Sequence, residues 1–326
     1  MNVYPIADAH TDYLYSLLNG ISPLMGGIPD QIHVSRESLQ KGNVRLQFFA
    51  AFVDSKEHPD SVTRCLELID QYRLMLDDWG DDIVELTRDN LDDVLANGPI
   101  GAVLAIEGGD AINGSLGVLR TMYRLGVRAM TLVWNRENAI ATPAILNAEE
   151  GLKPFGFECV REMNRLGMAI DVSHLNTRGF WDVIETSTQP ILATHSNAKA
   201  ITGHFRNLDD EQIKAVIVQK GFIGINFCAP FLNEDEDACC LDDMIRHIDH
   251  ILSLGGEEVL GLGSDWDGIG RCPRELHGAQ DFQLILSRLR DAGYSETLIE
   301  GIAYKNLARY MRAFLCRKSP AKPAFY

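Results

Sequence analysis

The chain has 326 residues, 46% of them hydrophobic and 23% charged, which is the balance of a globular protein and excludes extended disorder. Asp and Glu (46) outnumber Lys and Arg (30), so the formal net charge is −16, and a field of this sign repels the phosphate backbone of a nucleic acid. The longest apolar runs, such as Ile223–Phe231, are far shorter than the roughly 20 residues of a membrane-spanning helix. Neither nucleic acid nor a membrane is therefore expected as a partner.

The N-terminus and the cysteines both favour a cytoplasmic location. Residues Met1–Pro5 carry neither the basic region nor the apolar region of a signal peptide. The seven cysteines are scattered, odd in number and without a CxxC pair, which is typical of reduced thiols rather than of a disulfide framework. We therefore expect a cytoplasmic protein.

Short apolar runs recur along the chain, separated by helical patterns. Most are continuous rather than alternating, as expected for strands buried on both faces of a parallel sheet. Eight strands alternating with helices over about 300 residues predict an α/β fold, a (β/α)8 TIM barrel, with a doubly wound open sheet as the rival. The expected strands are Tyr4–Ala7, Arg45–Val53, Gly101–Ile106, Val127–Val133, Met168–Val172, Ile191–Ala193, Phe222–Phe227 and Val259–Leu262.

Amphipathic segments lie between these runs, and a glycine follows four of them at the position favoured after a helix C-terminus. No linker rich in Pro, Gly or Ser divides the chain. We predict one catalytic domain over residues 1–316 and a C-terminal tail over residues 317–326. The predicted helices are Ser61–Trp79, Leu116–Leu125, Phe157–Leu166, Leu208–Gln219, Leu241–Leu254 and Phe282–Ala292.

A TIM barrel has its active site at the carboxyl ends of its strands, so polar groups at these ends are candidates for chemistry. His10 and Asp12 follow the first strand and, two residues apart in extended chain, point to the same side, where they could bind one divalent cation. Glu107 ends an apolar run, where a carboxylate is heavily desolvated unless it is paired or bound to a metal. Taken singly, each could instead be a capping, salt-bridged or hydrogen-bonded structural group.

His174 and His195 stand at the exits of two further strands. One buried histidine is more often hydrogen-bonded than metal-bound, but two at equivalent strand ends favour a metal site. Asp265 follows the last strand in a glycine-rich segment, and we interpret it as a catalytic carboxylate that accepts a proton from water and passes it to a leaving amine.

Five of the eight strand ends thus carry His, Asp or Glu. They supply enough ligands for two metal ions if Glu107 bridges, and two ions roughly 3.5–4 Å apart lower the pKa of a shared water and hold the substrate oxygen. Mixed imidazole and carboxylate ligands favour zinc, with manganese or iron as other occupants. The predicted ligands are His10, Asp12, Glu107, His174 and His195.

The order and spacing of several motifs are typical of one family. These motifs are Asp8-Ala9-His10-Thr11-Asp12, Ile106-Glu107-Gly108-Gly109, Gly126–Leu132, Asp171-Val172-Ser173-His174, Thr194-His195-Ser196, Arg206-Asn207 and Gly263–Gly268. Over nearly the whole chain they resemble the membrane (renal) dipeptidase family, metal-dependent hydrolases of the amidohydrolase type with a (β/α)8 fold. The resemblance implies a soluble, bacterial-type, zinc-dependent dipeptidase in which a metal-bridging hydroxide attacks a small dipeptide, and it suggests a homodimer.

By position, the resemblance places one Zn²⁺ on His10 and Asp12 and a second on His174 and His195, with Glu107 as the bridge.

The same resemblance bears on four other positions. Asp265 matches the family's catalytic aspartate, and Arg206 matches the arginine that pairs with the dipeptide's C-terminal carboxylate, a role that suits a planar charged fork. Trp134 stands where the mammalian type has a histidine that helps to polarise the scissile carbonyl, and Asp110 stands where many relatives have histidine. Trp134 either forms a wall of the substrate site or packs in the core.

Three alternatives stay open. The same site could hydrolyse another amide, such as an N-acyl amino acid or a lactam, or the barrel could bind metal without catalysis. A different metal cluster could form from Cys239, Cys240, His247 and His250, although adjacent cysteines chelate one tetrahedral zinc poorly.

Overall fold

The structure is a computed structural model that describes residues 3–19, 32–146 and 149–315. Its strands form one sheet in which every neighbouring pair is parallel. The strands found in these residues are β1 (Ile6–Asp8), β2 (Val44–Phe52), β3 (Ile83–Glu85), β4 (Ile100–Glu107), β5 (Val127–Thr131), β6 (Ala169–Asp171), β7 (Leu192–Ala193), β8 (Phe222–Ile225) and β9 (Leu260–Leu262).

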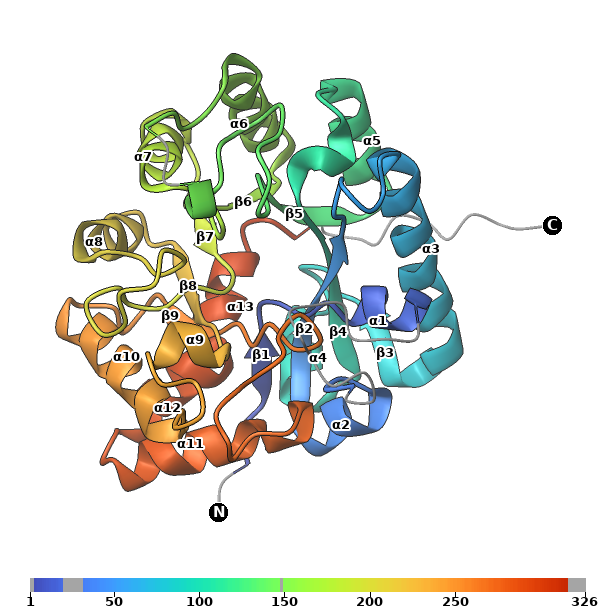
Figure 1. The fold of residues 1–326 in the computed structure, drawn as a ribbon. Helices are drawn as coiled ribbons and strands as arrows, with labels where there is room; N and C mark the ends of the chain where they lie inside the picture. Colours follow the sequence, from blue (N-terminus) through green and yellow to red (C-terminus); the bar gives the residue numbers. More distant parts are fainter. Residues whose placement is uncertain (1–2, 20–31, 147–148, 316–326) are drawn as a thin grey trace.

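Pairing between β2 and β4 closes this sheet into a barrel. The neighbours run in the order β2-β1-β9-β8-β7-β6-β5-β4, and β2 then pairs with β4 from Leu46–Gly101 to Phe52–Glu107. Eight strands therefore form a closed (β/α)8 barrel, with helices around the outside (Figure 1). The prediction of a TIM barrel is confirmed, and the rival open sheet is wrong.

Strand β3 was not among the eight predicted strands. It pairs with the beginning of β4, from Ile83–Ile100 to Glu85–Ala102, whereas β5 pairs with the end of β4. Three residues, the last of them Glu85, are too few to carry a periodic signal, so this strand exists because β4 offers an unpaired edge there.

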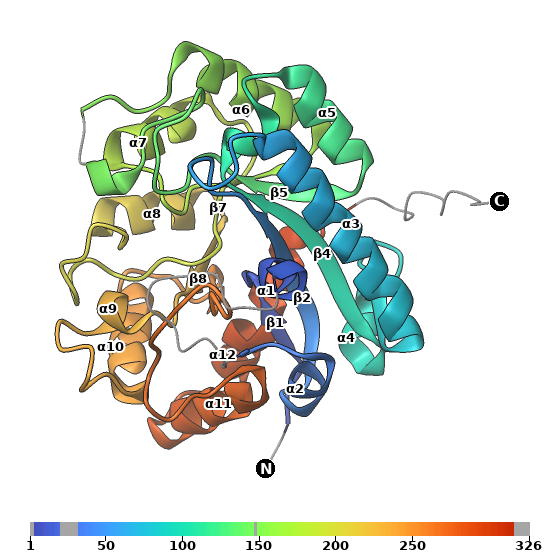
Figure 2. The same cartoon turned by 45° about the vertical axis from the view of Figure 1, so that its right-hand side comes forward.

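The helices cover the outer face of the barrel, as two views of the ribbon show (Figures 1 and 2). Five of the six predicted helices agree within two residues at both ends, and α6 begins earlier because Pro154 occupies its first turn. The helices are α1 (Tyr13–Asn19), α2 (Arg36–Lys41), α3 (Ser61–Trp79), α4 (Leu91–Asn97), α5 (Leu116–Arg124), α6 (Pro154–Leu166), α7 (Thr177–Thr186), α8 (Asp210–Val218), α9 (Ala229–Leu232), α10 (Leu241–Ser253), α11 (Phe282–Asp291), α12 (Glu296–Glu300) and α13 (Asn306–Met311).

Two apolar cores lie on opposite faces of the strands. On β4, Leu104 and Ile106 pack in the outer core beneath the helices, whereas Val103 and Ala105 belong to the inner core, which also contains residues of α13. Because side chains alternate along a strand, Glu107 lies on the same face as Val103 and Ala105. The alternation therefore directs this carboxylate toward the barrel interior.

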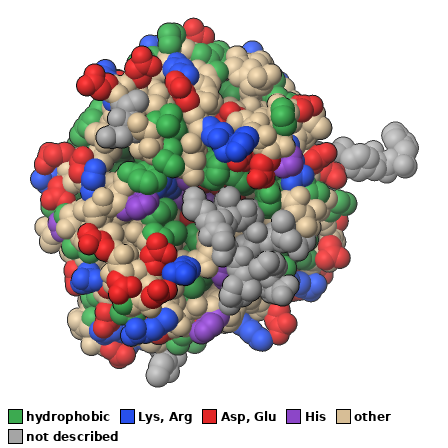
Figure 3. Space-filling model, viewed as in Figure 1, with side chains coloured by type: hydrophobic (Ala, Val, Ile, Leu, Met, Phe, Trp, Pro, Cys, Tyr) green, Lys and Arg blue, Asp and Glu red, His purple; other side chains and the backbone are tan. Residues whose placement is uncertain are grey.

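The six cysteines that the structure describes are free, and Cys316 and the predicted tail lie outside the described residues. No helix in the described part is both long enough and apolar enough to cross a bilayer. Acidic and basic side chains are intermixed on the visible face (Figure 3).

His247 ties α10 to the loop between β7 and α8. The backbone N–H of Ala198 donates to His247 Nδ1 over 3.1 Å, so the ring proton is on Nε2, which lies 3.1 Å from the carbonyl oxygen of Leu232. Burial lowers the pKa of His247 to about 4. The neutral ring thereby fixes the loop that carries Arg206.

These contacts also argue against the alternative metal cluster of Cys239, Cys240, His247 and His250. Both ring nitrogens of His247 are used by the backbone, and His250 Nε2 lies 2.7 Å from Asp210 Oδ1. Burial raises the pKa of Cys239 to about 12, which opposes formation of a thiolate. In the described part of the chain, these cysteines and histidines form no metal-binding group.

We expect His247 to make the folded protein less stable as the pH is lowered. Below pH 6.5 the unfolded chain protonates this histidine, while the folded chain resists protonation down to pH 4, so the free energy of unfolding should decrease between these values by about 3 kcal/mol. His247→Gln keeps a donor and an acceptor but does not titrate. Urea denaturation should therefore show a shallower pH dependence for the variant than for the wild type. Equal slopes would contradict the assignment, because Asp243, Arg246 and His250, which also face the ring, are present in both proteins.

Candidate metal centre

Glu107, the last residue of β4, lies at the centre of a buried cluster at the carboxyl end of the barrel. Its Oε2 atom is 3.4 Å from His10 Nε2. Its Oε1 atom is 3.0 Å from His174 Nε2 and 3.5 Å from His195 Nε2. The two carboxylate oxygens therefore face two separate groups of side chains.

The first group gathers around His10. His10 Nε2 lies 3.7 Å from Asp12 Oδ2 and 3.9 Å from Asp265 Oδ1. An isolated parallel β-bridge between Thr11 and Trp266 aligns the two segments that follow β1 and β9. A Cβ at Gly268 would lie 2.2 Å from Asp12 Oδ2 and 2.6 Å from Asp265 Oδ1. Glycine at this position therefore permits the two acidic side chains to approach one another.

The second group consists of two histidines from neighbouring strands. His174 follows β6, His195 follows β7, and their Nε2 atoms are 3.0 Å apart. His174 has φ +66° and Asp265 has φ +62°, left-handed conformations that residues other than glycine adopt at an energetic cost. Such conformations are characteristic of functional sites, where the surrounding fold holds them in place.

The charges in this cluster are set by burial and by close neighbours. Burial opposes ionisation of Glu107, but the close approach of His10 and His174 outweighs it and holds the pKa of Glu107 well below its usual range. Burial and the charge of Arg206 lower the pKa of His174 to about 4. An ionised carboxylate and a neutral imidazole are the forms that bind metal cations.

The donor set fits a metal cation. Among the predicted metal ligands, three buried atoms have no hydrogen-bond partner in the described part of the chain: His10 Nε2, Asp12 Oδ1 and Glu107 Oε2. Buried polar atoms are normally satisfied, and a bound cation would supply partners of the kind that these atoms lack. Candidate donor atoms lie within 4.8 Å of one another in two overlapping groups, His10–Glu107–His195 and His10–Asp12–Asp265.

Asp265 is held by a residue that the sequence analysis did not identify. Asn226, directly after β8, donates from Nδ2 to Asp265 Oδ2 over 2.9 Å. Burial raises the pKa of Asp265 to about 6, although the charge of His10 opposes the rise. Asn226 is fully buried and directly follows a strand, as the predicted ligands do. This position in the sequence could have identified it as a site residue.

Arg206 is a buried cation beside this cluster. Its guanidinium carbon lies 5.6 Å from the centre of the Phe231 ring, and Nη2 donates to the carbonyl oxygen of His195 over 3.5 Å. Nε has no hydrogen-bond partner, and Arg206 forms no ion pair within 4 Å, among the described residues. A buried guanidinium without a carboxylate partner can bind an anionic ligand.

Trp134 packs at the edge of the cluster. Its ring centre lies 4.8 Å from that of Phe52 and 6.2 Å from that of His174, and 9% of the residue is exposed. The indole therefore belongs to the outer apolar core and also contacts a candidate ligand.

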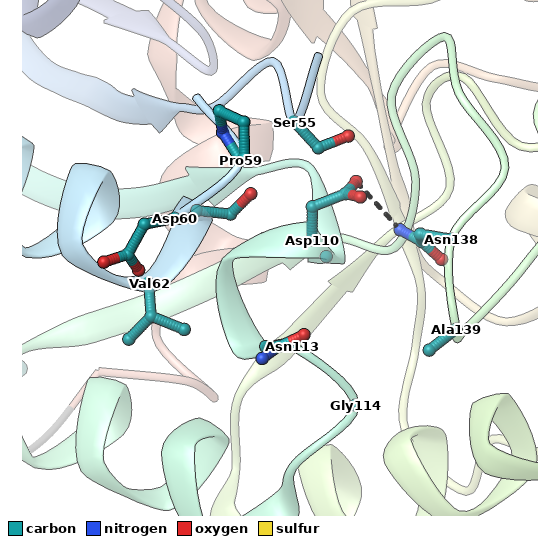
Figure 4. Close-up of a pocket in the computed structure, with 11 residues that line it drawn as sticks. Ser55, Pro59, Asp60, Val62, Asp110, Asn113, Gly114, Asn138 and Ala139 are labelled. Atoms are coloured by element: carbon teal, nitrogen blue, oxygen red, sulfur yellow. Dashed lines mark hydrogen bonds between the residues drawn. The ribbon is translucent and has the colours of Figure 1, made fainter. Parts of the chain in front are cut away.

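A separate pocket of about 180 Å³ lies beside α3 (Figure 4). Asp110, three residues after Glu107, lines it and accepts a hydrogen bond from Asn138 Nδ2 over 3.3 Å. None of the predicted metal ligands lines this pocket.

Comparison with known proteins identifies relatives over most of the chain. The family model described as membrane dipeptidase (peptidase family M19) matches residues 1–322. An uncharacterised dipeptidase of Schizosaccharomyces pombe is 32% identical, with 93% of this chain and 79% of the relative covered.

Two solved structures have the same fold. The metallopeptidase dipeptidase AC superposes with a TM-score of 0.88 at 28% identity and covers 96% of this chain and 99% of its own. A metallopeptidase from Rhodobacter sphaeroides, bound to a phosphinate mimic of the dipeptide L-Ala-D-Ala, has a TM-score of 0.88 at 26% identity and covers 96% and 100%. The chain therefore belongs to the membrane dipeptidase family, peptidase family M19, and is a metal-dependent dipeptidase.

Proposed function

We propose that the protein hydrolyses small dipeptides with two Zn²⁺ ions per chain. One ion would be held by His10 and Asp12, the other by His174 and His195, and Glu107 would bridge them. The observation that supports this division is that Glu107 Oε2 faces His10, while Oε1 faces His174 and His195. Imidazole and carboxylate ligands together favour zinc.

Bound zinc would supply an activated water nucleophile and stabilise the negative charge that develops on the peptide oxygen. The proton transfer is assigned to Asp265. Asn226 holds Oδ2, which leaves Oδ1, 3.9 Å from His10 Nε2, on the side of the metal ligands. Oδ1 would take a proton from water and deliver it to the leaving amine, and a pKa near 6 suits both steps.

Arg206 and Trp134 are proposed to bind the dipeptide. Arg206 would pair with the C-terminal carboxylate, which supplies the anion that this buried guanidinium lacks among the described residues. Trp134, packed against Phe52 and His174, would form an apolar wall and limit access of water. The ligand of the Rhodobacter sphaeroides relative suggests that a D-residue at the C-terminal side is accepted.

Two broader predictions accompany this function. We propose that residues 1–316 form one catalytic domain, which is supported by barrel strands that span residues 6–262 and by α13, which packs in the inner core. The homodimer and the cytoplasmic location stay predictions, and light scattering would test the dimer.

Chelation tests the proposed metal centre. Metal analysis of the purified protein should give two zinc ions per chain, and removing them should abolish hydrolysis of dipeptides until zinc is restored. The substrate panel should contain L,L- and L,D-dipeptides, N-acyl amino acids and a lactam. Hydrolysis of the N-acyl amino acids or the lactam alone would support the other amidohydrolase function. Bound metal without hydrolysis of any compound would support a non-catalytic barrel.

Asp265→Asn should lower kcat by about two to four orders of magnitude, because the amide keeps the shape of the carboxylate but cannot accept a proton. Metal analysis of the same preparation serves as the control and should still find both ions. Normal turnover by this variant would remove Asp265 from the reaction.

Arg206→Lys keeps a positive charge but loses the planar fork. We expect KM for a dipeptide to rise about 10- to 100-fold with a smaller change in kcat, because charge-assisted hydrogen bonds to the carboxylate are lost. The corresponding dipeptide amide, which has no C-terminal carboxylate, should be hydrolysed with the same KM by both proteins. An unchanged KM for the free dipeptide would contradict the role of Arg206.

A further inference from the structure

Asp171, the last residue of β6, is a buried carboxylate behind the histidines and is not itself one of the proposed ligands. Its Oδ1 accepts the backbone N–H groups of Ser173 and Thr194, each over 3.0 Å. Its Oδ2 accepts the hydroxyl groups of Thr131 over 2.7 Å and Thr194 over 2.5 Å. Four donors from three strand ends therefore fix both oxygens of Asp171.

The direction of the hydrogen bond between Thr194 and His195 follows from counting the protons that each group can donate. The hydroxyl of Thr194 has one proton, and the short bond to the Asp171 carboxylate uses it. Thr194 Oγ1 also lies 2.7 Å from His195 Nδ1, so in this contact it can only accept. The ring proton of His195 is therefore on Nδ1.

A neutral imidazole with its proton on Nδ1 has a lone pair on Nε2. His195 Nε2 faces Glu107 Oε1 and His174 Nε2. His174 reaches the same state by a different contact, because its Nδ1 lies 3.0 Å from Asn135 Oδ1. Two imidazole lone pairs and one carboxylate oxygen then converge, an arrangement that a bound cation would stabilise.

We propose that Asp171 and Thr194 are positioning residues that set the tautomer of His195, so that Nε2 presents its lone pair to a divalent cation. The proposal rests on the dipeptidase function above, since it concerns the ion assigned to His174 and His195. Groups that orient a ligating histidine in this way typically affect metal affinity by 10- to 100-fold. The chain His195–Thr194–Asp171 acts through the ligand and touches neither metal nor substrate.

Asp171→Asn is the sharpest test, because the surroundings determine how the amide must lie. Ser173 N–H and Thr194 N–H require an acceptor at the Oδ1 position, so the amide NH₂ must occupy the Oδ2 position. The NH₂ group then donates to Thr194 Oγ1, and the Thr194 hydroxyl is free to donate to His195 Nδ1, which at 2.7 Å is nearer than Ser173 Oγ at 3.2 Å. The proton of His195 is thereby moved to Nε2, where it blocks metal binding.

The measurement is zinc affinity by competition with a chromophoric chelator, together with ¹⁵N NMR of the histidines in metal-free protein. Asp171→Asn should weaken one of the two zinc-binding steps by roughly 10- to 100-fold and leave the other step unchanged. In the NMR spectrum, the His195 ring should change from the Nδ1–H to the Nε2–H tautomer.

Threonine variants separate positioning from structural support. Thr194→Val removes the acceptor for His195 at nearly constant volume and should weaken zinc binding as Asp171→Asn does, whereas Thr194→Ser should restore it. The matched control is Thr131→Val, which removes the other hydroxyl donor to Asp171 Oδ2 but does not touch a histidine. This control should lose stability yet keep the wild-type zinc affinity and the Nδ1–H tautomer.

The outcomes distinguish this inference from the function on which it rests. Wild-type protein that binds no zinc would overturn the metal centre itself. Wild-type protein that binds two ions, with the same affinities and the same His195 tautomer in Asp171→Asn and Thr194→Val, would overturn the positioning role alone. Should Asp171→Asn fail to fold, Thr194→Val against Thr194→Ser decides the question.

Discussion

Strand β4 pairs with β2 from residue 101 to residue 107, and this pairing determines where Glu107 lies relative to all the other buried polar groups. Closure of the sheet brings the ends of β1, β6, β7 and β9 to one rim. Alternation along β4 then directs the Glu107 side chain inward, between His10 on one side and the two later histidines on the other. A slip of one residue in this register would turn the carboxylate into the outer apolar core.

Burying so many acids and imidazoles opposes folding unless each is paired. The fold meets this demand in two ways. Around the cluster, residues such as Asp171 and Asn226 satisfy polar groups with hydrogen bonds from the backbone and from hydroxyl or amide side chains. Inside the cluster, several donor atoms stay unmatched among the described residues, and these are the atoms that a metal cation would bind. Binding of a cation to these atoms would therefore stabilise the folded protein.

The substrate side of the site depends on a different part of the fold. Arg206 lies on a loop that is fixed at two points, by His247 from α10 and by Asn207, whose amide donates to the carbonyl oxygens of Thr202 and Phe231. Phe231 in turn lies under the guanidinium. A long cationic side chain in a buried position needs such support, because the entropy of ordering it would otherwise reduce the affinity for a carboxylate. The loop is therefore as much a part of the site as the strand ends.

Local pattern predicted the eight barrel strands, six of the helices and the positions of the acids and histidines at the strand ends, because strand burial and helix periodicity are properties of contiguous residues. The family resemblance added the assignment of Arg206. Strand β3, the support of Asp265 by Asn226 and the control of His195 by Asp171 were decided by the tertiary structure. Asn226 and Asp265 are 39 residues apart, and Asp171 and Thr194 are 23 apart. Hydrogen bonds between such residues depend on which strands become neighbours and in which register, and no local periodicity encodes that information.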